Sequence, residues 1–367
     1  MQIMRHAFSV AVLATMLIAE TAFAAPPRHA SKQNATAPPA AASTTREPPA
    51  SAVAPADQKR IQAIRQYQHD LVSVVALRSD PAYLLGAAIL ARPFKHQTRG
   101  LDFDALSQRA AAAPDAGPAA EWARLGICKS EAECPNADAF AYLEKNAADN
   151  AAVWIVALDV AARDKNAEAE RAALKRAAGA QMYDDYFGKA LAGVAKTITV
   201  LPPRADTIQN AHDGQPDNPE GVRVLVAVMG TQAHIRPTFG PVEDLCSKNA
   251  SDKRDDIKSQ CLDLAHTLQW GSSPTARAMG LRIQSVLDPD DKAQNDQASR
   301  DLAWQVHQYS DLLQHALTDP SLASAWLALA RNGGTELSLI LASLRANHIP
   351  LDAPDANAPT SADSSGQ

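Results

Sequence analysis

Apolar residues recur every three or four positions through most of this chain, and this spacing constrains its fold more than any other feature. Ile61, Ile64, Leu71 and Val75, for example, fall on one face of a helix. Helix-length stretches of this kind alternate with short breaks. We therefore expect an all-α fold of stacked helical hairpins. In the first half, the expected helices cover residues 57–78, 81–92, 102–113, 118–128, 137–147, 151–164, 167–179 and 182–200.

Several of these stretches begin with a residue that can cap a helix. Asp80 comes before Pro81, and an acidic cap followed by proline is typical of a helix start. Asp102, Asn136 and Asn150 also stand directly before apolar-periodic runs. Side chains of this type accept hydrogen bonds from the first free backbone amides of a helix. These positions therefore predict where helices begin.

A break in the apolar pattern divides the chain in two. Residues 201–217 open with prolines and continue with polar residues that have no apolar period, which predicts a linker loop. The stretch GVRVLVAVMG at 221–230 is rich in valine and could form a strand. Asn218 and Pro219 before it indicate a helix start, so we predict a helix. The expected helical domains are residues 57–200 and 218–350.

Tryptophan and leucine spacings in the first domain resemble a known repeat. Trp122, Leu125 and Gly126 have the W-x-x-L-G spacing of the first helix of a tetratricopeptide repeat. Trp154 follows one repeat length later, and residues 149–178 resemble one whole helical hairpin of this kind. The chain thus resembles tetratricopeptide-like (TPR- or Sel1-type) α-helical repeat proteins of the secreted or periplasmic bacterial kind.

The resemblance extends more weakly to residues 319–344, where Trp326 follows an Asp-Pro pair. It implies an α-α superhelix with an extended concave surface that binds a peptide or a partner domain. The same tryptophan, leucine and alanine spacings also suit the core of an irregular helical bundle. Both arrangements stay open at this point.

The two ends of the chain differ in composition from the rest. Residues 1–24 predict a secretory signal peptide, with Arg5, an apolar run and Ala22-Phe23-Ala24 as a cleavage site. Residues 25–56 and 351–367 are rich in proline, alanine and small polar residues, and we expect disordered tails there. No run reaches about 18 apolar residues. We expect a periplasmic or secreted protein without stable membrane insertion after signal cleavage.

Charge argues against one class of partner. The chain has 35 basic and 41 acidic residues, for a net charge of −6. The basic residues form no sustained stripe, which a nucleic-acid-binding surface would need. We expect no nucleic acid partner.

The four cysteines are Cys128, Cys134, Cys246 and Cys261. An even number after a signal peptide favours disulfides. Three pairings are possible, and the local one, 128–134 with 246–261, needs the fewest assumptions. A redox role would favour C-x-x-C with its first cysteine at a helix N-terminus. A zinc site would favour two closely spaced pairs. Neither pattern is present, so we expect structural disulfides.

Other candidate sites are weaker. His307, Asp311 and His315 share one helix face, but the two histidines lie about 12 Å apart along the axis, too far to bind one ion. We interpret them as a solvated polar face. His212 and Asp213 could be a base and its orienting acid, but no nucleophile accompanies them. Familiar catalytic and phosphate-binding motifs are missing, so we expect no catalytic residue, metal or cofactor.

These observations favour a non-enzymatic protein-interaction or scaffold module whose partner is an unidentified envelope or secreted protein. If the repeat resemblance holds, outward-facing polar residues of the first helices line the binding groove. In this chain they are Arg124, Asp159 and Arg163. One alternative is a cell-wall (peptidoglycan) enzyme or its accessory factor. Another is a small-molecule-binding protein with a pocket between the two domains.

Overall fold

The structure is a computed structural model that describes residues 55–94, 100–128, 133–208, 218–248 and 255–354. The predicted signal peptide, all but the last two residues of the predicted N-terminal tail, residues 209–217 of the linker and residues 355–367 lie outside the described residues. None of the described helices is both long and apolar enough to cross a membrane.

The predicted helices of the first half are confirmed. Their ends agree with the predicted ones within a few residues, except that the last begins five residues later than predicted, at Phe187 rather than 182. Tyr186, just before it, has a left-handed backbone with φ of 58°. The helices are α2 (Pro55–Val75), α3 (Pro81–Ala91), α4 (Phe103–Ala112), α5 (Pro118–Arg124), α6 (Ala137–Asn146), α7 (Ala151–Arg163), α8 (Ala167–Ala178) and α9 (Phe187–Thr197).

The second half is helical as well. The valine-rich stretch forms a helix, as Asn218 and Pro219 predicted. Extended pairing in the described chain is limited to one isolated bridge, between Asn150 and Met182. The elements are η2 (Ala205–Thr207), α10 (Pro219–Thr231), α11 (Gly240–Lys248), α12 (Asp255–Gln269), α13 (Pro274–Leu287), η3 (Pro289–Asp291), α14 (Lys292–Ala316), α15 (Pro320–Asn332) and α16 (Glu336–Ala346).

The predicted caps hold the helix starts in place. The Asp80 carboxylate accepts hydrogen bonds from the Ala82 and Tyr83 amides at 2.9 and 3.2 Å. Asn136 and Asn218 accept in the same way from the third residue of α6 and of α10. These bonds satisfy amides that a helix leaves free at its N-terminus. The all-α prediction is therefore confirmed, and so are the predicted start positions of α3, α6 and α10.

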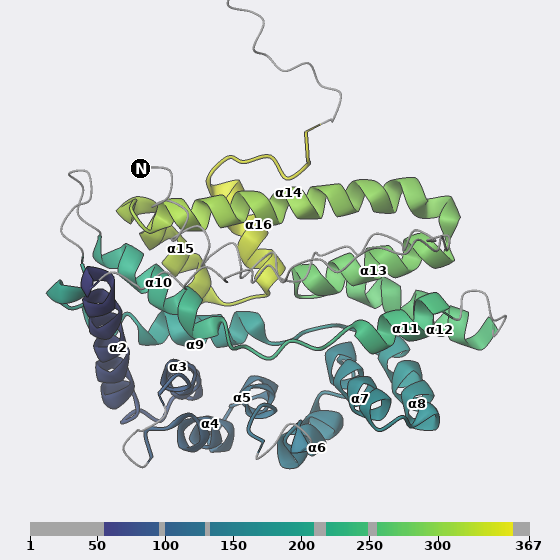
Figure 1. Ribbon diagram of the computed structural model, residues 1–367, viewed down its shortest axis with the longest axis horizontal. Coiled ribbons are helices and arrows are strands. Elements are labelled where there is room, and N and C mark those ends of the chain that lie inside the picture. The colour runs from purple at the N-terminus through teal and green to yellow at the C-terminus, as the bar shows by residue number, and fades with distance from the viewer. Residues whose placement is uncertain (1–54, 95–99, 129–132, 209–217, 249–254, 355–367) are drawn as a thin grey trace, which may run out of the picture.

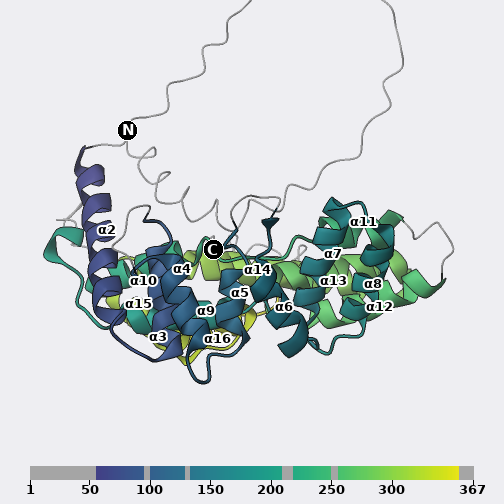
Figure 2. The ribbon, with the colours of Figure 1, turned by 90° about the horizontal axis from the view of Figure 1, so that it is seen from below.

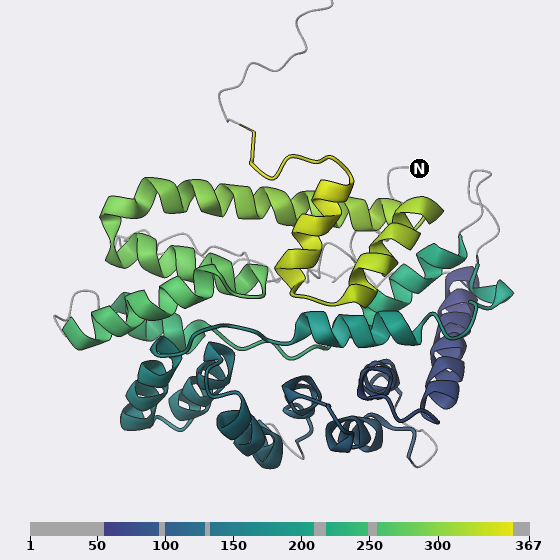
Figure 3. The same ribbon diagram turned by 180° about the vertical axis from the view of Figure 1, so that it is seen from behind.

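The helices form an elongated molecule with a repeat-like arrangement of packed hairpins. Helices α3 to α8 lie in a row along one side, and the long helix α14 runs along the opposite side (Figure 1). Viewed from below, the row extends over most of the length of the molecule (Figure 2). From behind, α15 and α16 are seen between α14 and α9 (Figure 3).

Two hydrophobic cores fill this arrangement. The first core draws on α2, α3, α4, α9, α10, α15, α16 and the C-terminal half of α14. The second draws on α6, α7, α8, α11, α12 and α13. Helix α5 contributes to both, with Ala120 and Ala123 in the first core and Trp122 in the second. Both predicted domains, 57–200 and 218–350, therefore contribute to both cores.

The first core depends on a close crossing of α3 and α9. Gly86 and Gly193 meet there, and a Cβ atom added at Gly86 would lie 2.2 Å from the Gly193 carbonyl oxygen. The two helix backbones are thus in direct contact. Leu90 and Val194 are fully buried on the same two helices.

The C-terminal end of the described chain is held on α14. Trp304 Nε1 donates to the Pro350 carbonyl at 2.9 Å, and Gln305 Nε2 donates to the Leu351 carbonyl at 2.9 Å. The Ala353 amide donates to the Asp301 carboxylate at 2.9 Å. The predicted tail from residue 351 was therefore wrong for residues 351–353. Its polar composition did not reveal that α14 side chains bind its backbone.

Candidate functional site

Two extended segments join the two cores in the middle of the molecule. Residues 179–186 connect α8 to α9, and residues 232–239 connect α10 to α11. They run side by side between the two groups of helices (Figure 1). The Tyr183 and Phe239 rings, one from each segment, lie 5.9 Å apart between centroids. Trp122 Nε1 also donates to the Ile235 carbonyl at 3.0 Å.

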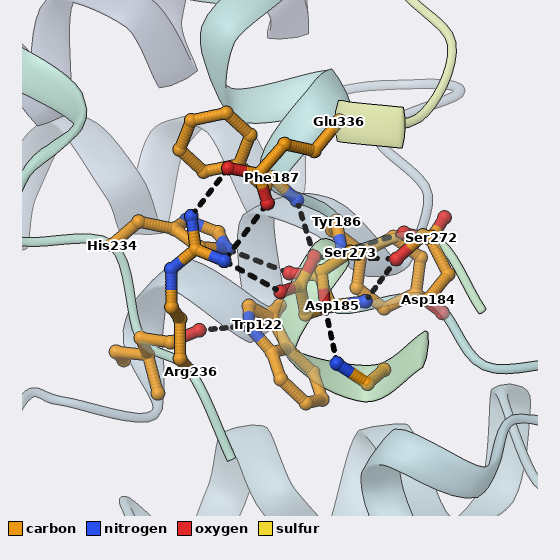
Figure 4. Close-up of polar contacts among 12 residues, drawn as sticks. Trp122, Asp184, Asp185, Tyr186, Phe187, His234, Arg236, Ser272, Ser273 and Glu336 are labelled. Carbon is orange, nitrogen blue, oxygen red and sulfur yellow. Dashed lines mark hydrogen bonds and ion pairs between the residues drawn. The ribbon is translucent and has the colours of Figure 1, made fainter. Parts of the chain in front are cut away.

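Asp185 lies at the centre of this junction (Figure 4). Its side chain is 1% exposed, and one carboxylate oxygen accepts from the Phe187 amide at 3.2 Å. The other oxygen has no hydrogen-bond partner and lies 3.8 Å from Arg236 Nη1. Burial raises the pKa of Asp185, while the Arg236 charge lowers it. The carboxylate is therefore buried and is balanced mainly by one guanidinium.

Arg236 connects three elements of the chain. Its guanidinium donates to both Glu336 carboxylate oxygens at 2.8 Å, in the two-bond geometry typical of arginine and carboxylate. It also lies over the Phe187 ring, 4.9 Å from the centroid. Burial lowers the pKa of Arg236, but Glu336 and Asp185 together raise it above its ordinary value. The guanidinium therefore stays charged and ties α16 to both connecting segments.

His234 joins the two segments directly. Its ring contacts Phe187 edge-on, with centroids 5.4 Å apart. Its Nε2 lies 2.7 Å from the Asp185 carbonyl oxygen, and because that oxygen can only accept, Nε2 carries the proton and donates. Burial lowers the pKa of His234 to about 4, and the nearby charges of Arg236 and Arg92 act in the same direction. The imidazole is therefore neutral near pH 7.

This shift predicts a pH dependence of stability. The pKa of His234 is about 4 in the folded protein and about 6.5 when unfolded, so the unfolded chain binds more protons between these values. The free energy of unfolding should therefore fall as the pH drops from about 6.5 to about 4. Asp185, whose pKa is raised, acts in the opposite direction.

Urea titrations of His234→Gln across this range should show a smaller loss of stability than the native protein. Gln can keep the donated bond but does not titrate. His266→Gln, on the exposed surface of α12, serves as the matched control. Equal pH profiles for His234→Gln and the native protein would contradict the assignment.

The sequence did not single out this junction. Asp185, Arg236 and Glu336 lie far apart in the chain. The first two stand in segments between helices and Glu336 begins α16, where charged residues are ordinary. The one available signal was the paired acids Asp184 and Asp185 beside the aromatic Tyr186 and Phe187 in an apolar context. Charge patterns alone do not show which basic residue balances such a pair.

The predicted groove residues do not share one environment. Arg124 does not point outward as expected: its side chain is only 17% exposed and binds the Glu121 carboxylate at 2.6 Å. Its helix, α5, lies between the two cores, which covers the side chain. Asp159 and Arg163 on α7 are 30% and 40% exposed and 3.7 Å apart. Arg163 Nη2 also donates to the Cys134 carbonyl at 2.7 Å.

The four cysteines form two disulfides between the nearest pairs. Cys128 bonds to Cys134 with an S–S distance of 2.04 Å, and Cys246 bonds to Cys261 at 2.09 Å. Their surroundings differ. Cys246 and Cys261 are 3% and 1% exposed within the second core, whereas Cys128 and Cys134 are half-buried in the turn between α5 and α6.

Removing the two disulfides should have unequal effects. By the chain-entropy model, the 246–261 disulfide stabilises the folded protein by about 3 kcal/mol. The 128–134 disulfide closes a shorter loop and contributes about 2 kcal/mol. Removal of the Cys246 and Cys261 sulfurs also loses packing in the second core, which adds to the loss of stability. Thermal unfolding of Cys246→Ala/Cys261→Ala should show the larger drop in Tm, with Cys128→Ala/Cys134→Ala as its counterpart. A larger drop in Tm for Cys128→Ala/Cys134→Ala would contradict this expectation.

The other titratable sites noted in the sequence form no ligand set. His307 Nε2 and Asp311 Oδ2 are 3.8 Å apart, with side chains 69% and 45% exposed, and His315 is also exposed. Among the described residues, no group of three or more His, Cys, Asp or Glu side chains could hold a metal ion. His212 and Asp213 lie outside the described residues.

A large apolar side chain stands exposed beside the junction. Trp270, which follows α12, is 78% exposed. On either side of it, Thr267 and Ser272 donate hydrogen bonds to carbonyls of the 179–186 segment, at 3.3 and 3.0 Å. Trp270 is thus fixed alongside that segment, where Met182 is 42% exposed. Such exposure is unusual for tryptophan, which is mostly buried in folded proteins.

Comparison with known proteins found no family model, no curated protein and no solved structure that matches this chain.

Proposed function

We propose that this protein is a non-enzymatic protein-interaction module of the bacterial envelope, which binds a secreted or envelope protein through its helical surface. The observation that carries this proposal is Trp270, whose side chain is 78% exposed on a backbone fixed from both sides. Tryptophan is enriched among the residues that contribute most to protein–protein binding. Met182, which is 42% exposed on the 179–186 segment, adds flexible apolar surface.

The surrounding framework suits this role. In the junction of the two connecting segments, Arg236 forms ion pairs with Asp185 and Glu336. A fixed framework lowers the entropy that is lost when a partner binds. The stacked hairpins are consistent with a tetratricopeptide-like class, in which partners bind along a superhelical surface. The two disulfides favour an oxidising compartment, in keeping with a periplasmic or secreted location.

The test compares two exposed apolar residues. Trp270→Ala and Leu77→Ala remove side chains that are 78% and 87% exposed, the second in the turn after α2. Purified native protein and both variants would be crosslinked in envelope extract and the captured proteins identified by mass spectrometry. One defined partner should be retained by Leu77→Ala and reduced at least about tenfold by Trp270→Ala, as for a binding hot spot.

The earlier groove assignment is tested in the same assay. If Asp159 and Arg163 line the binding surface, Asp159→Ala and Arg163→Ala should also reduce capture of that partner. Unchanged capture by both would remove them from the proposal and leave Trp270 as the anchor. Unchanged capture by Trp270→Ala, at equal thermal stability, would contradict the proposed surface.

The alternative function, a peptidoglycan enzyme or its accessory factor, has less support. Burial raises the pKa of both Asp184 and Asp185, as for a catalytic acid. Asp185, however, is 1% exposed and is held beside Arg236. Release of soluble fragments from purified peptidoglycan, lost in Asp184→Asn, would favour the enzyme over the binding module.

A further inference from the structure

The two disulfides differ in whether an external thiol can reach them. Thiol–disulfide exchange requires a thiolate to approach one sulfur in line with the S–S bond. Cys246 and Cys261 are enclosed by the second core, at 3% and 1% exposure. Cys128 and Cys134 are half-buried at the surface. Exchange at the surface pair therefore needs no opening of the core.

The described residues that flank the surface pair are held together by hydrogen bonds that do not involve sulfur. The Asn136 amide donates to the Leu125 carbonyl at 2.9 Å, and its side chain donates to the Ile127 carbonyl at 3.0 Å. The same side chain accepts from the Ala139 amide at the start of α6. Loss of the disulfide therefore leaves α5 and α6 tied together.

The charges around the two sulfurs are unequal. Cys134 stands just before the N-terminus of α6, whose free amides favour a negative charge. The Arg163 guanidinium reaches the Cys134 backbone, with 2.7 Å between Nη2 and the carbonyl oxygen. Cys128 instead follows the C-terminus of α5. The acids Glu133 and Asp159 are also near, and Asp159 pairs with Arg163 at 3.7 Å.

We propose that the Cys128–Cys134 disulfide is a thiol-exchange site, opened by a dithiol protein of the oxidoreductase class while Cys246–Cys261 stays closed. A thiolate of the dithiol attacks Cys128 Sγ, the S–S bond breaks, and Cys134 leaves as the thiolate. The second thiol then loses its proton and attacks the external sulfur of the mixed disulfide, which releases Cys128. Two electrons pass to this protein, two protons complete its thiols, and the dithiol becomes a disulfide.

The first experiment uses the full protein without denaturant. Dithiothreitol is the probe, and samples are alkylated over time and mapped by peptide mass spectrometry. Cys128 and Cys134 should be alkylated at least about tenfold faster than Cys246 and Cys261, because the buried pair must wait for local unfolding. The helical circular dichroism signal should stay unchanged while Cys128 and Cys134 are being alkylated. Equal alkylation rates for the two cysteine pairs would overturn the proposal. Loss of helicity during alkylation of Cys128 and Cys134 would also overturn it.

The second experiment tests the direction of exchange. Alkylation rate against pH gives the thiol pKa of Cys134 in Cys128→Ala and that of Cys128 in Cys134→Ala. The pKa of Cys134 should be the lower one, and Arg163→Ala should slow opening of the native disulfide by about threefold or more. Arg163→Lys, which keeps the charge, should restore the rate, and Arg171→Ala on the exposed face of α8 is the control. A lower pKa for Cys128, or no effect of Arg163→Ala, would overturn the assigned direction.

Discussion

Replacing Gly86 with alanine should destabilise the protein by about 3 kcal/mol or more, at or above the upper end of the usual cost of overpacking a core. The added Cβ would lie 2.2 Å from the Gly193 carbonyl oxygen and 2.4 Å from Thr197 Oγ1. The first obstacle is backbone, so a change of rotamer cannot relieve it, and α3 and α9 must move apart. The free energy of unfolding from urea denaturation measures the effect.

Gly240→Ala is the matched control. Gly240 is the first residue of α11, and a Cβ added there meets no atom within 4 Å. Alanine favours the helix more than glycine does, so this variant should be neutral or slightly stabilised. If Gly86→Ala unfolds at the same urea concentration as Gly240→Ala, the helices do not cross as closely as described.

Arg236→Ala should lower the free energy of unfolding by about 3 kcal/mol. This value is the lower end of the range for removing one partner of a buried ion pair. The lower end applies because the Arg236 side chain is 32% exposed. Its loss leaves Asp185, at 1% exposure, without a balancing charge. Chemical denaturation at pH 7 measures the change.

Two further variants separate charge from packing. Arg204→Ala removes a surface arginine that is 46% exposed beside Asp70 and Asp206, and it should lower the stability far less than Arg236→Ala does, because solvent screens exposed ion pairs. Adding Asp185→Asn to Arg236→Ala should recover part of the loss, because the buried charge is then gone. A double variant as unstable as the sum of its single changes would mean that Arg236 acts through packing alone.

The sequence predicted the helices because the signals that specify them are local. A period near 3.6 and a cap such as Asp80 or Asn136 lie within a few residues of the helix start. The disulfides were predictable for the same reason, since each joins neighbouring helices. The late start of α9 was missed because Tyr186 adopts a left-handed conformation that its sequence context does not indicate.

Contacts between residues far apart in the chain could not be predicted from the sequence. Gly86 gives no sign that Gly193 is its neighbour, and Asp185 gives no sign of Arg236. The prediction that Arg124 faces outward failed because exposure depends on what covers α5, and that cover comes from both halves of the chain. Trp270 was overlooked because an apolar residue at the end of an amphipathic helix is usually part of a core.

The sharing of both cores by both halves of the chain bears on how such a protein can evolve. A module that is complete within one stretch of sequence can be duplicated, lost or fused to another gene. Here a cut between α9 and α10 would leave two pieces, neither of which contains a whole core. New versions of this fold therefore have to arise by changes at its surface and loops, with the whole helical framework inherited together.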